Sequence, residues 1–199
     1  MDLVVVLDAS GSIRAANPSD GSRDNWNEML EFTTDLVDRL SIGQYNSRVG
    51  VVRYSDSAQN IFYLNSYYNK ETIKSEIRSI SYPGGQTYTG DGLRSAHMEQ
   101  FTYDRGDRPE VHNVIILITD GVSNIDVPST TREALVAKNK GITVYSIGVT
   151  NGVDEEELKA VSTNPQQLGA NYFMAADFDT LRDVADTLIK SACRPSYGK

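Results

Sequence analysis

Near its start the chain reads Leu3-Val4-Val5-Val6-Leu7-Asp8-Ala9-Ser10-Gly11-Ser12, five aliphatic residues followed at once by an acid and two hydroxyl side chains. A short continuous apolar run bounded by turn residues is typical of a strand that is buried on both faces of a parallel sheet. Ligands of open α/β sheets bind beyond the carboxyl ends of such strands. This segment therefore predicts a buried strand with a binding site directly after it.

The same strand-like character recurs along the chain, and helical periodicity follows it each time. Buried strands are predicted at Val49 to Tyr54, Val114 to Thr119 and Thr143 to Val149. Apolar residues with helical spacing predict helices at residues 26–40, 92–101 and 131–139, from Asp154 onward, and at 178–189. This alternation indicates an α/β domain with a mainly parallel sheet and helices on both faces.

One further strand is expected at Ile61 to Leu64, soon after the strand that ends at Tyr54. The intervening residues 55–60 are too few for a crossover helix, so the two strands are expected to form an antiparallel pair at one sheet edge. Because no repeat or linker interrupts the pattern, we expect a single domain over residues 1–199, with 1–192 as its core and 193–199 as a C-terminal tail.

Composition excludes several classes of protein. The 199 residues are 39% hydrophobic and 23% charged, which is ordinary for a globular domain and unlike a disordered one. The formal net charge is −8, and no Lys/Arg block occurs, so nucleic-acid binding is not expected and cations or basic partners fit better. No apolar run approaches the roughly 20 residues that a membrane-spanning helix requires.

Oxygen-bearing side chains gather in three loops that the predicted sheet brings to one rim. The first strand leads into Asp8, Ser10 and Ser12, a Gly-rich loop at residues 84–90 carries Thr87, and the strand ending at Thr119 leads into Asp120. Each piece alone is more typical of a turn or a helix cap. Together they form a set of hard oxygen ligands that suits Mg²⁺, with Mn²⁺ or Ca²⁺ as options, and argues against zinc.

With these motifs the chain resembles a von Willebrand factor type A domain, the fold of the integrin inserted domain, and within that family the matrix members such as matrilins and type VI collagen. The resemblance covers nearly the whole chain. It rests on residues 8–13, 49–55, 84–90, 114–121 and 141–149. It implies a Rossmann-like, doubly wound sheet of six strands, mostly parallel, with one antiparallel edge strand and helices on both faces.

The resemblance also implies a metal-ion-dependent adhesion site (MIDAS). Matched by motif position, its residues would be Asp8, Ser10, Ser12, Thr87 and Asp120. In the family pattern the two serines bind the metal directly, the threonine and the second aspartate bind directly or through water, and the first aspartate acts mainly through water. One coordination position stays open for a carboxylate of the partner. The family further implies that the final helix, here about residues 178–192, can slide, although a fixed helix is an equal alternative.

The segment from Ile13 to Asn25 is polar, contains Gly and Pro, and is longer than the usual turn of the family, so it is predicted to be a loop beside the metal rim. It either shapes partner choice or is a tolerated insertion. The candidate partner-contact residues are Arg14, Asn17, Asp20, Arg23 and, from the Gly-rich loop, Tyr88. Trp26, just after the segment, is interpreted as a core residue.

Three other features of the sequence bear on function. Arg105-Gly106-Asp107 spells an integrin-recognition tripeptide, but so short a match weighs little. His97 and His112 are isolated and are interpreted as structural. Cys193 is the single cysteine, which excludes a disulfide scaffold and a Cys-rich zinc site. In extracellular relatives such a Cys often pairs with one preceding the first strand; the alternative is an unpaired thiol in an intracellular relative.

These observations predict a non-enzymatic, divalent-metal-dependent adhesion module of a secreted, extracellular matrix protein. It would bind collagen or another matrix protein through a partner carboxylate, as one domain of a longer chain. The alternatives are an intracellular scaffold subunit of the same fold and an acidic matrix domain that binds calcium mineral. Catalysis is not expected, because position 10 is Ser where an aspartyl phosphotransferase would carry a second acid, and neither a phosphate-binding loop nor a Gly-x-Ser-x-Gly nucleophile elbow occurs.

Overall fold

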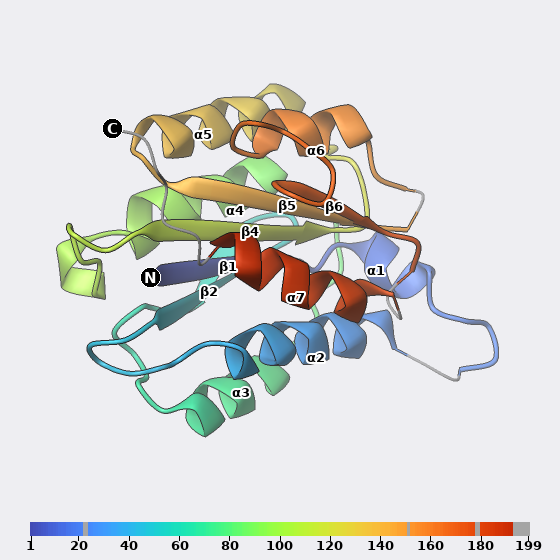
Figure 1. Ribbon diagram of the computed structural model, residues 1–199. Coiled ribbons are helices and arrows are strands. Elements are labelled where there is room, and N and C mark those ends of the chain that lie inside the picture. The colour runs from blue at the N-terminus through green and yellow to red at the C-terminus, as the bar shows by residue number, and fades with distance from the viewer. Residues whose placement is uncertain (22–23, 151, 178–179, 193–199) are drawn as a thin grey trace.

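The computed structural model describes residues 1–21, 24–150, 152–177 and 180–192. Its centre is a six-stranded sheet of order β3-β2-β1-β4-β5-β6 (Figure 1). The strands are β1 (Asp2–Asp8), β2 (Arg48–Tyr54), β3 (Ala58–Phe62), β4 (Asn113–Thr119), β5 (Thr143–Val149) and β6 (Tyr172–Ala175). β3 runs antiparallel to β2 at one edge, and the other pairs are parallel. The predicted fold class is confirmed.

Helices cover both faces of the sheet, with α2, α3 and α7 on one side and α4, α5 and α6 on the other (Figure 1). The helices are α1 (Gly11–Ala15), α2 (Asn25–Asp38), α3 (Lys70–Arg78), α4 (Thr89–Ser95), α5 (Val127–Asn139), α6 (Glu155–Val161) and α7 (Leu181–Ala192). α4 continues as a π-helical turn, Ala96–Gln100, and a 3₁₀ turn follows at Tyr103–Arg105.

The central strand β1 explains why its sequence is apolar without alternation. Leu3, Val5 and Leu7 belong to the core under α2 and α7, whereas Val4 and Val6 belong to the core under α4 and α5. All five side chains are fully buried. Because β1 pairs with both β2 and β4, the residues that follow it lie in the middle of the carboxyl-end rim of the sheet.

Several predicted boundaries were wrong or incomplete. β3 lies at Ala58–Phe62, earlier than the expected 61–64, and β6 was not located because only four residues form it. α3 was missed because the segment is polar and buries only Ile73 and Ile77. The predicted loop over residues 13–25 begins inside α1, where Ile13 is fully buried.

Other expectations were confirmed. Trp26 is 2% exposed, and its indole Nε1–H donates to the carbonyl oxygen of Ile80 at 3.1 Å, as suits a core residue. The Arg105-Gly106-Asp107 tripeptide is bound into the fold: Gly106 is buried and its carbonyl accepts a hydrogen bond from Arg48, and the guanidinium of Arg105 lies 4.1 Å from the centre of the Tyr63 ring. Arg105 itself is exposed, and the small weight of this short match stays a prediction.

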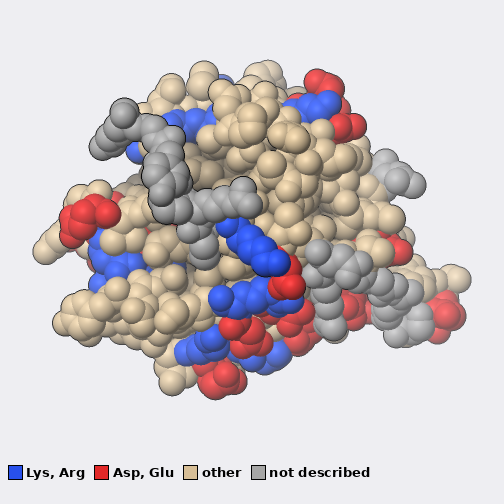
Figure 2. Space-filling model, viewed as in Figure 1, with Lys and Arg blue, Asp and Glu red and all other residues tan. Residues whose placement is uncertain are grey.

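The outer face of α2, α3 and α7 carries acidic and basic side chains side by side (Figure 2). Arg78 pairs with Glu31 across α2 and α3, and Arg39 pairs with Asp186 of α7. These exposed pairs contribute little stability, because water and salt screen them. They do make this face electrostatically mixed rather than uniformly acidic.

Candidate metal centre

Asp8, the last residue of β1, is fully buried. Its Oδ1 accepts a hydrogen bond from the backbone N–H of Ser10 at 2.9 Å, and its Oδ2 accepts one from the hydroxyl of Thr119 at 2.7 Å. Burial raises the pKa of Asp8, while the hydrogen bonds from Ser10 and Thr119 oppose that rise. The carboxylate is thus held in a fixed orientation at the rim.

A chain of hydroxyl groups connects the first loop to the loop after β4. The Oγ atoms of Ser10 and Ser12 lie 3.1 Å apart, and Ser12 Oγ donates to Oδ1 of Asp120 at 2.7 Å. Gly11 suits the close approach of the two loops here: its backbone N–H donates to the carbonyl oxygen of Gly85 at 2.8 Å, and a Cβ at position 11 would lie only 3.3 Å from that oxygen.

Asp120 is 3% exposed, and burial raises its pKa to about 7, with the nearby Asp8 carboxylate adding to the rise and the Ser12 hydrogen bond opposing it. Within the described parts of the chain, no Lys, Arg or His forms an ion pair with either aspartate. Two buried carboxylates are therefore close together without a basic side chain to balance them, which is a place for a cation.

Thr87 reaches the same rim through the backbone bonds of its own loop. It is 4% exposed; its N–H donates to Oδ1 of Asn124 at 2.9 Å, and its carbonyl accepts the N–H of Asn124 at 2.9 Å and the hydroxyl of Ser123 at 3.2 Å. The Gly11–Gly85 bond joins this loop to the first one. Hydrogen bonds thus link four of the five predicted residues in series, namely Asp8, Ser10, Ser12 and Asp120. The fifth, Thr87, lies on the loop that the Gly11–Gly85 bond joins to them.

The donor set fits a hard divalent cation. It offers two carboxylates and three hydroxyls and no thiolate or imidazole, which is the chemistry that Mg²⁺, Mn²⁺ and Ca²⁺ prefer. Among the described residues, no group of three or more His, Cys, Asp or Glu side chains is placed to hold a metal ion. A cation at this rim would therefore depend on the serine and threonine hydroxyls.

Three supporting residues were not singled out from the sequence. Thr119 donates to Asp8, Asn124 fixes the backbone of Thr87, and the Tyr82 hydroxyl donates to the carbonyl oxygen of Ser10 at 2.6 Å. Thr119 stands beside Asp120 in the quoted motif and could have been found there. The Tyr82 bond joins residues 72 positions apart, and no local pattern signals it.

The candidate partner-contact residues differ in how they are held. Arg14 forms a two-point ion pair with Asp24, at 2.7 and 3.2 Å, and Oδ1 of Asn17 accepts the N–H of Asn25 at 2.8 Å. Asp20 is exposed, and Tyr88 is half-buried with its hydroxyl 3.5 Å from Asp126. Arg23 lies outside the described residues, as does Cys193.

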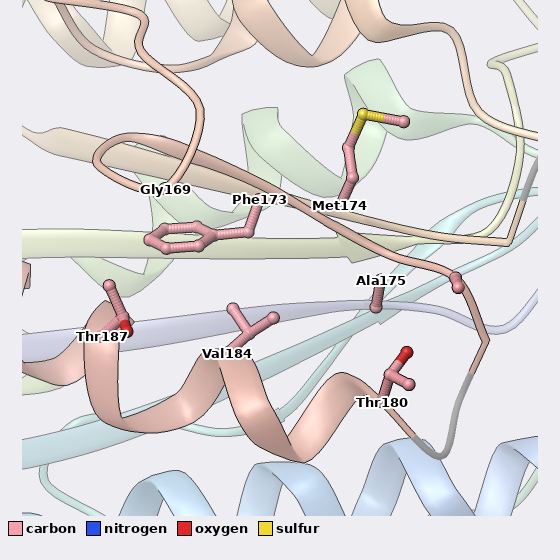
Figure 3. Close-up of a pocket in the computed structure, with 8 residues that line it drawn as sticks. Gly169, Phe173, Met174, Ala175, Thr180, Val184 and Thr187 are labelled. Atoms are coloured by element: carbon pink, nitrogen blue, oxygen red, sulfur yellow. The ribbon is translucent and has the colours of Figure 1, made fainter.

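The last helix was predicted from residue 178, which is outside the described residues, and α7 begins at Leu181. A groove of about 340 Å³ lies between β6 and α7, with Phe173 on one side and Val184 and Thr187 on the other (Figure 3). α7 is anchored beside this groove by Leu188, which is fully buried. Sliding of this helix stays a prediction.

A sequence model of the von Willebrand factor type A domain matches residues 2–187. The chain belongs to this family. Mouse matrilin-1 is 33% identical over 192 residues, which are 96% of this chain and 36% of matrilin-1. The human collagen alpha-5(VI) chain is 33% identical over 195 residues, 97% of this chain and 7% of that one. The von Willebrand factor A chain described here thus spans about a third of matrilin-1 and a small part of the collagen chain.

Solved structures of proximal thread matrix protein 1 from the mussel byssus share the fold. One is 31% identical with a TM-score of 0.88, covering 96% of this chain and 47% of that one. Another, with a TM-score of 0.87, is described as having a zinc-occupied MIDAS motif. This relative supports divalent-metal binding at the motif in general, and the preference of this chain for Mg²⁺ over zinc stays a prediction. Among the described helices, none is long and apolar enough to span a membrane.

Proposed function

We propose that this von Willebrand factor A domain is a non-enzymatic adhesion module whose divalent metal, bound at Asp8, Ser10, Ser12, Thr87 and Asp120, engages a carboxylate of a matrix protein. The observation that carries the proposal is the bonded series from Asp8 through Ser10 and Ser12 to Asp120. This series brings two buried carboxylates together with the two serine hydroxyls, and no basic side chain among the described residues forms an ion pair with either carboxylate.

The residues of the chain divide the work at this rim. Ser10, Ser12 and Thr87 offer neutral oxygens, and Asp120 offers a carboxylate that now accepts from Ser12. Both oxygens of Asp8 accept hydrogen bonds, one from the N–H of Ser10 and one from the hydroxyl of Thr119. The main contribution of Asp8 is therefore to orient the loop. A bound Mg²⁺, with Mn²⁺ or Ca²⁺ as substitutes, would supply an electrophilic position that an aspartate or glutamate of the partner completes.

The relatives support an extracellular matrix role. Matrilin-1 and the collagen alpha-5(VI) chain are matrix proteins in which the matching segment is one part of a longer chain. By this likeness we place the domain in a secreted, multidomain matrix protein, with collagen or another matrix protein as partner. An intracellular scaffold of the same fold and a calcium-mineral-binding matrix domain are the alternatives that the test below addresses.

A non-catalytic role agrees with the local chemistry. An aspartyl nucleophile needs an accessible oxygen, but Asp8 is fully buried and both of its oxygens accept hydrogen bonds. The residue two positions on is Ser10, which cannot act as a general acid near neutral pH in the way that a carboxylic acid can.

The deciding experiment is solid-phase binding of the 199-residue chain to a panel of collagens, other matrix proteins and calcium phosphate mineral. Binding to a matrix protein that needs Mg²⁺ and is abolished by EDTA supports the proposal and names the partner class. Binding to the protein panel that survives EDTA moves the contact away from the metal rim, to residues 13–25 or to the segment 63–88, which carries five of the 11 tyrosines. Binding to mineral alone supports the calcium-mineral alternative, and no binding at all favours the scaffold role.

A further inference from the structure

Two side chains bond to the backbone of Ser10, one from the end of β1 and one from a residue 72 positions later. The N–H of Ser10 donates to Asp8 Oδ1 at 2.9 Å, and its carbonyl oxygen accepts the hydroxyl of Tyr82 at 2.6 Å. The same hydroxyl lies 3.4 Å from the N–H of Arg14, which follows in α1. Tyr82 therefore contacts the main chain at both ends of the turn that presents Ser10 and Ser12.

The Tyr82 ring has its own contacts, independent of its hydroxyl. The guanidinium carbon of Arg14 lies 4.4 Å from the ring centre, and the Trp26 ring lies 5.5 Å away at a tilt of 50°. Trp26 in turn donates to the carbonyl of Ile80, two residues before Tyr82. These contacts hold the ring in one place and so aim the hydroxyl at Ser10.

A closed circuit of contacts joins the metal loop to the start of α2. Arg14 pairs with Asp24, and Asp24 caps α2 by accepting the N–H of Trp26 at 3.1 Å. From Trp26 the circuit returns to the Tyr82 ring and through the hydroxyl to Ser10. The contacts thus connect the backbone of Ser10 to Arg14 in α1 and to Asp24 and Trp26 at the start of α2.

We infer that Tyr82 is a positioning residue for the metal loop: its hydroxyl sets the place of Ser10, and its ring couples that place to Arg14 and Trp26. This inference rests on the proposed metal site. Groups that orient a metal ligand from behind typically change metal affinity by about 10- to 100-fold when removed. A purely structural tyrosine would change stability in the same way with and without metal.

The test compares Tyr82→Phe with wild type in Mg²⁺ titrations by calorimetry and by the fluorescence of Trp26, the single tryptophan. The variant keeps the ring and loses only the hydroxyl. We expect wild type to bind Mg²⁺ with a change in Trp26 emission, and Tyr82→Phe to bind about tenfold more weakly with a smaller emission change at saturation. Unfolding of both proteins in EDTA should differ little.

The matched control is Tyr172→Phe, which removes a tyrosine hydroxyl bond of 2.7 Å, to Glu155, from edge strand β6. Its Mg²⁺ affinity should equal that of wild type. If wild type binds Mg²⁺ and Tyr82→Phe shows the same Mg²⁺ affinity and the same Trp26 emission response, this inference is overturned. The proposed metal site is then unaffected. A wild type that binds no divalent cation would overturn the proposed function and this inference with it. If Tyr82→Phe unfolds in EDTA, Arg14→Gln replaces it, because it removes the contact of the guanidinium with the Tyr82 ring. Mg²⁺ affinity and a Trp26 emission response equal to those of wild type in Arg14→Gln would then overturn the inference.

Discussion

Ser12 Oγ donates a 2.7 Å hydrogen bond to Oδ1 of Asp120, a residue 108 positions later in the chain. The contact exists because β1 and β4 are parallel neighbours, with Leu7 opposite Ile118, so the loops after them meet. The hydroxyl donates to a carboxyl group whose pKa burial raises to about 7, and this hydrogen bond opposes the rise. The same two groups are positioned to share a metal ion, which is the basis of the first prediction.

Asp120→Ala should abolish the response of the domain to Mg²⁺. A ligand present at 100 times its dissociation constant stabilises a fold by about 2.7 kcal/mol, and this gain should be seen in the wild-type melting temperature and be lost in the variant. In EDTA the variant should melt close to wild type, because it removes one of two neighbouring buried carboxylates. Asp104→Ala, an exposed acid in the 3₁₀ turn, serves as the control. An Mg²⁺ shift that persists in Asp120→Ala would mean that the site assignment is wrong.

Thr119→Val should destabilise the fold by about 1–3 kcal/mol even without metal, because it removes the hydroxyl that donates to the buried Oδ2 of Asp8. The side chains are nearly equal in volume, so packing is retained. Urea unfolding in EDTA measures the effect, with Thr143→Val on β5 as a control that removes a half-buried hydroxyl at the opposite end of a strand. Equal stability of the two variants would show that the Thr119 hydroxyl does not support Asp8.

Much of the rim could be predicted from sequence because continuous apolar runs mark central parallel strands and the residues after them must meet at one edge. β6 and α3 were less visible: the first has four residues, and the second buries only Ile73 and Ile77. Both are defined by their neighbours in the fold rather than by their own pattern.

Contacts made to backbone atoms were the least predictable part of the site. The bond from Tyr82 to the Ser10 carbonyl requires the loop to be folded before it can be recognised. Arg14 and Asn17 were predicted as partner contacts because they are polar. In the fold Arg14 pairs with the side chain of Asp24, and Asn17 accepts the backbone N–H of Asn25. Their role toward a partner stays a prediction.

Gly90→Ala should destabilise the domain by about 1–3 kcal/mol through overpacking between α4 and α5. A Cβ at Gly90 would lie 1.9 Å from Ser129 Oγ and 2.7 Å from Ser129 Cβ. Ser129→Gly removes both atoms, so the double variant should recover part of the loss. Urea unfolding of the four proteins gives the coupling energy. Additive effects of the two changes would contradict a direct clash at this contact.

His97 should make the fold less stable as the pH falls below about 6.5, the ordinary pKa of histidine. The residue is 2% exposed and is faced by Glu133 and Lys140, with Arg132 bound to Glu133. Its Nε2 lies 2.9 Å from Glu133 Oε2, and its Nδ1 lies 3.2 Å from Lys140 Nζ. The Lys140 ammonium also donates to the carbonyl oxygen of His97 at 3.0 Å, and a hydrogen bond from it to Nδ1 requires a neutral ring with its proton on Nε2.

Burial lowers the pKa of His97 in the folded state, and the charge of Lys140 adds to this, while Glu133 opposes it. Below pH 6.5 the unfolded chain then binds a proton that the folded chain does not, so the free energy of unfolding decreases as the pH falls. The limit is about 1.4 kcal/mol per pH unit for one proton. His112, whose pKa burial also lowers, contributes with the same sign.

Urea unfolding of wild type and His97→Gln in EDTA at pH 7.5 and 5.5 isolates the share of His97, because all other titrating groups are common to both proteins. We expect the wild type to lose about 1 kcal/mol more than the variant between the two pH values. The parallel comparison with His112→Gln separates the second histidine. An equal pH dependence in wild type and His97→Gln would contradict a lowered pKa for His97, because it would mean that the pairing with Glu133 fully offsets the burial.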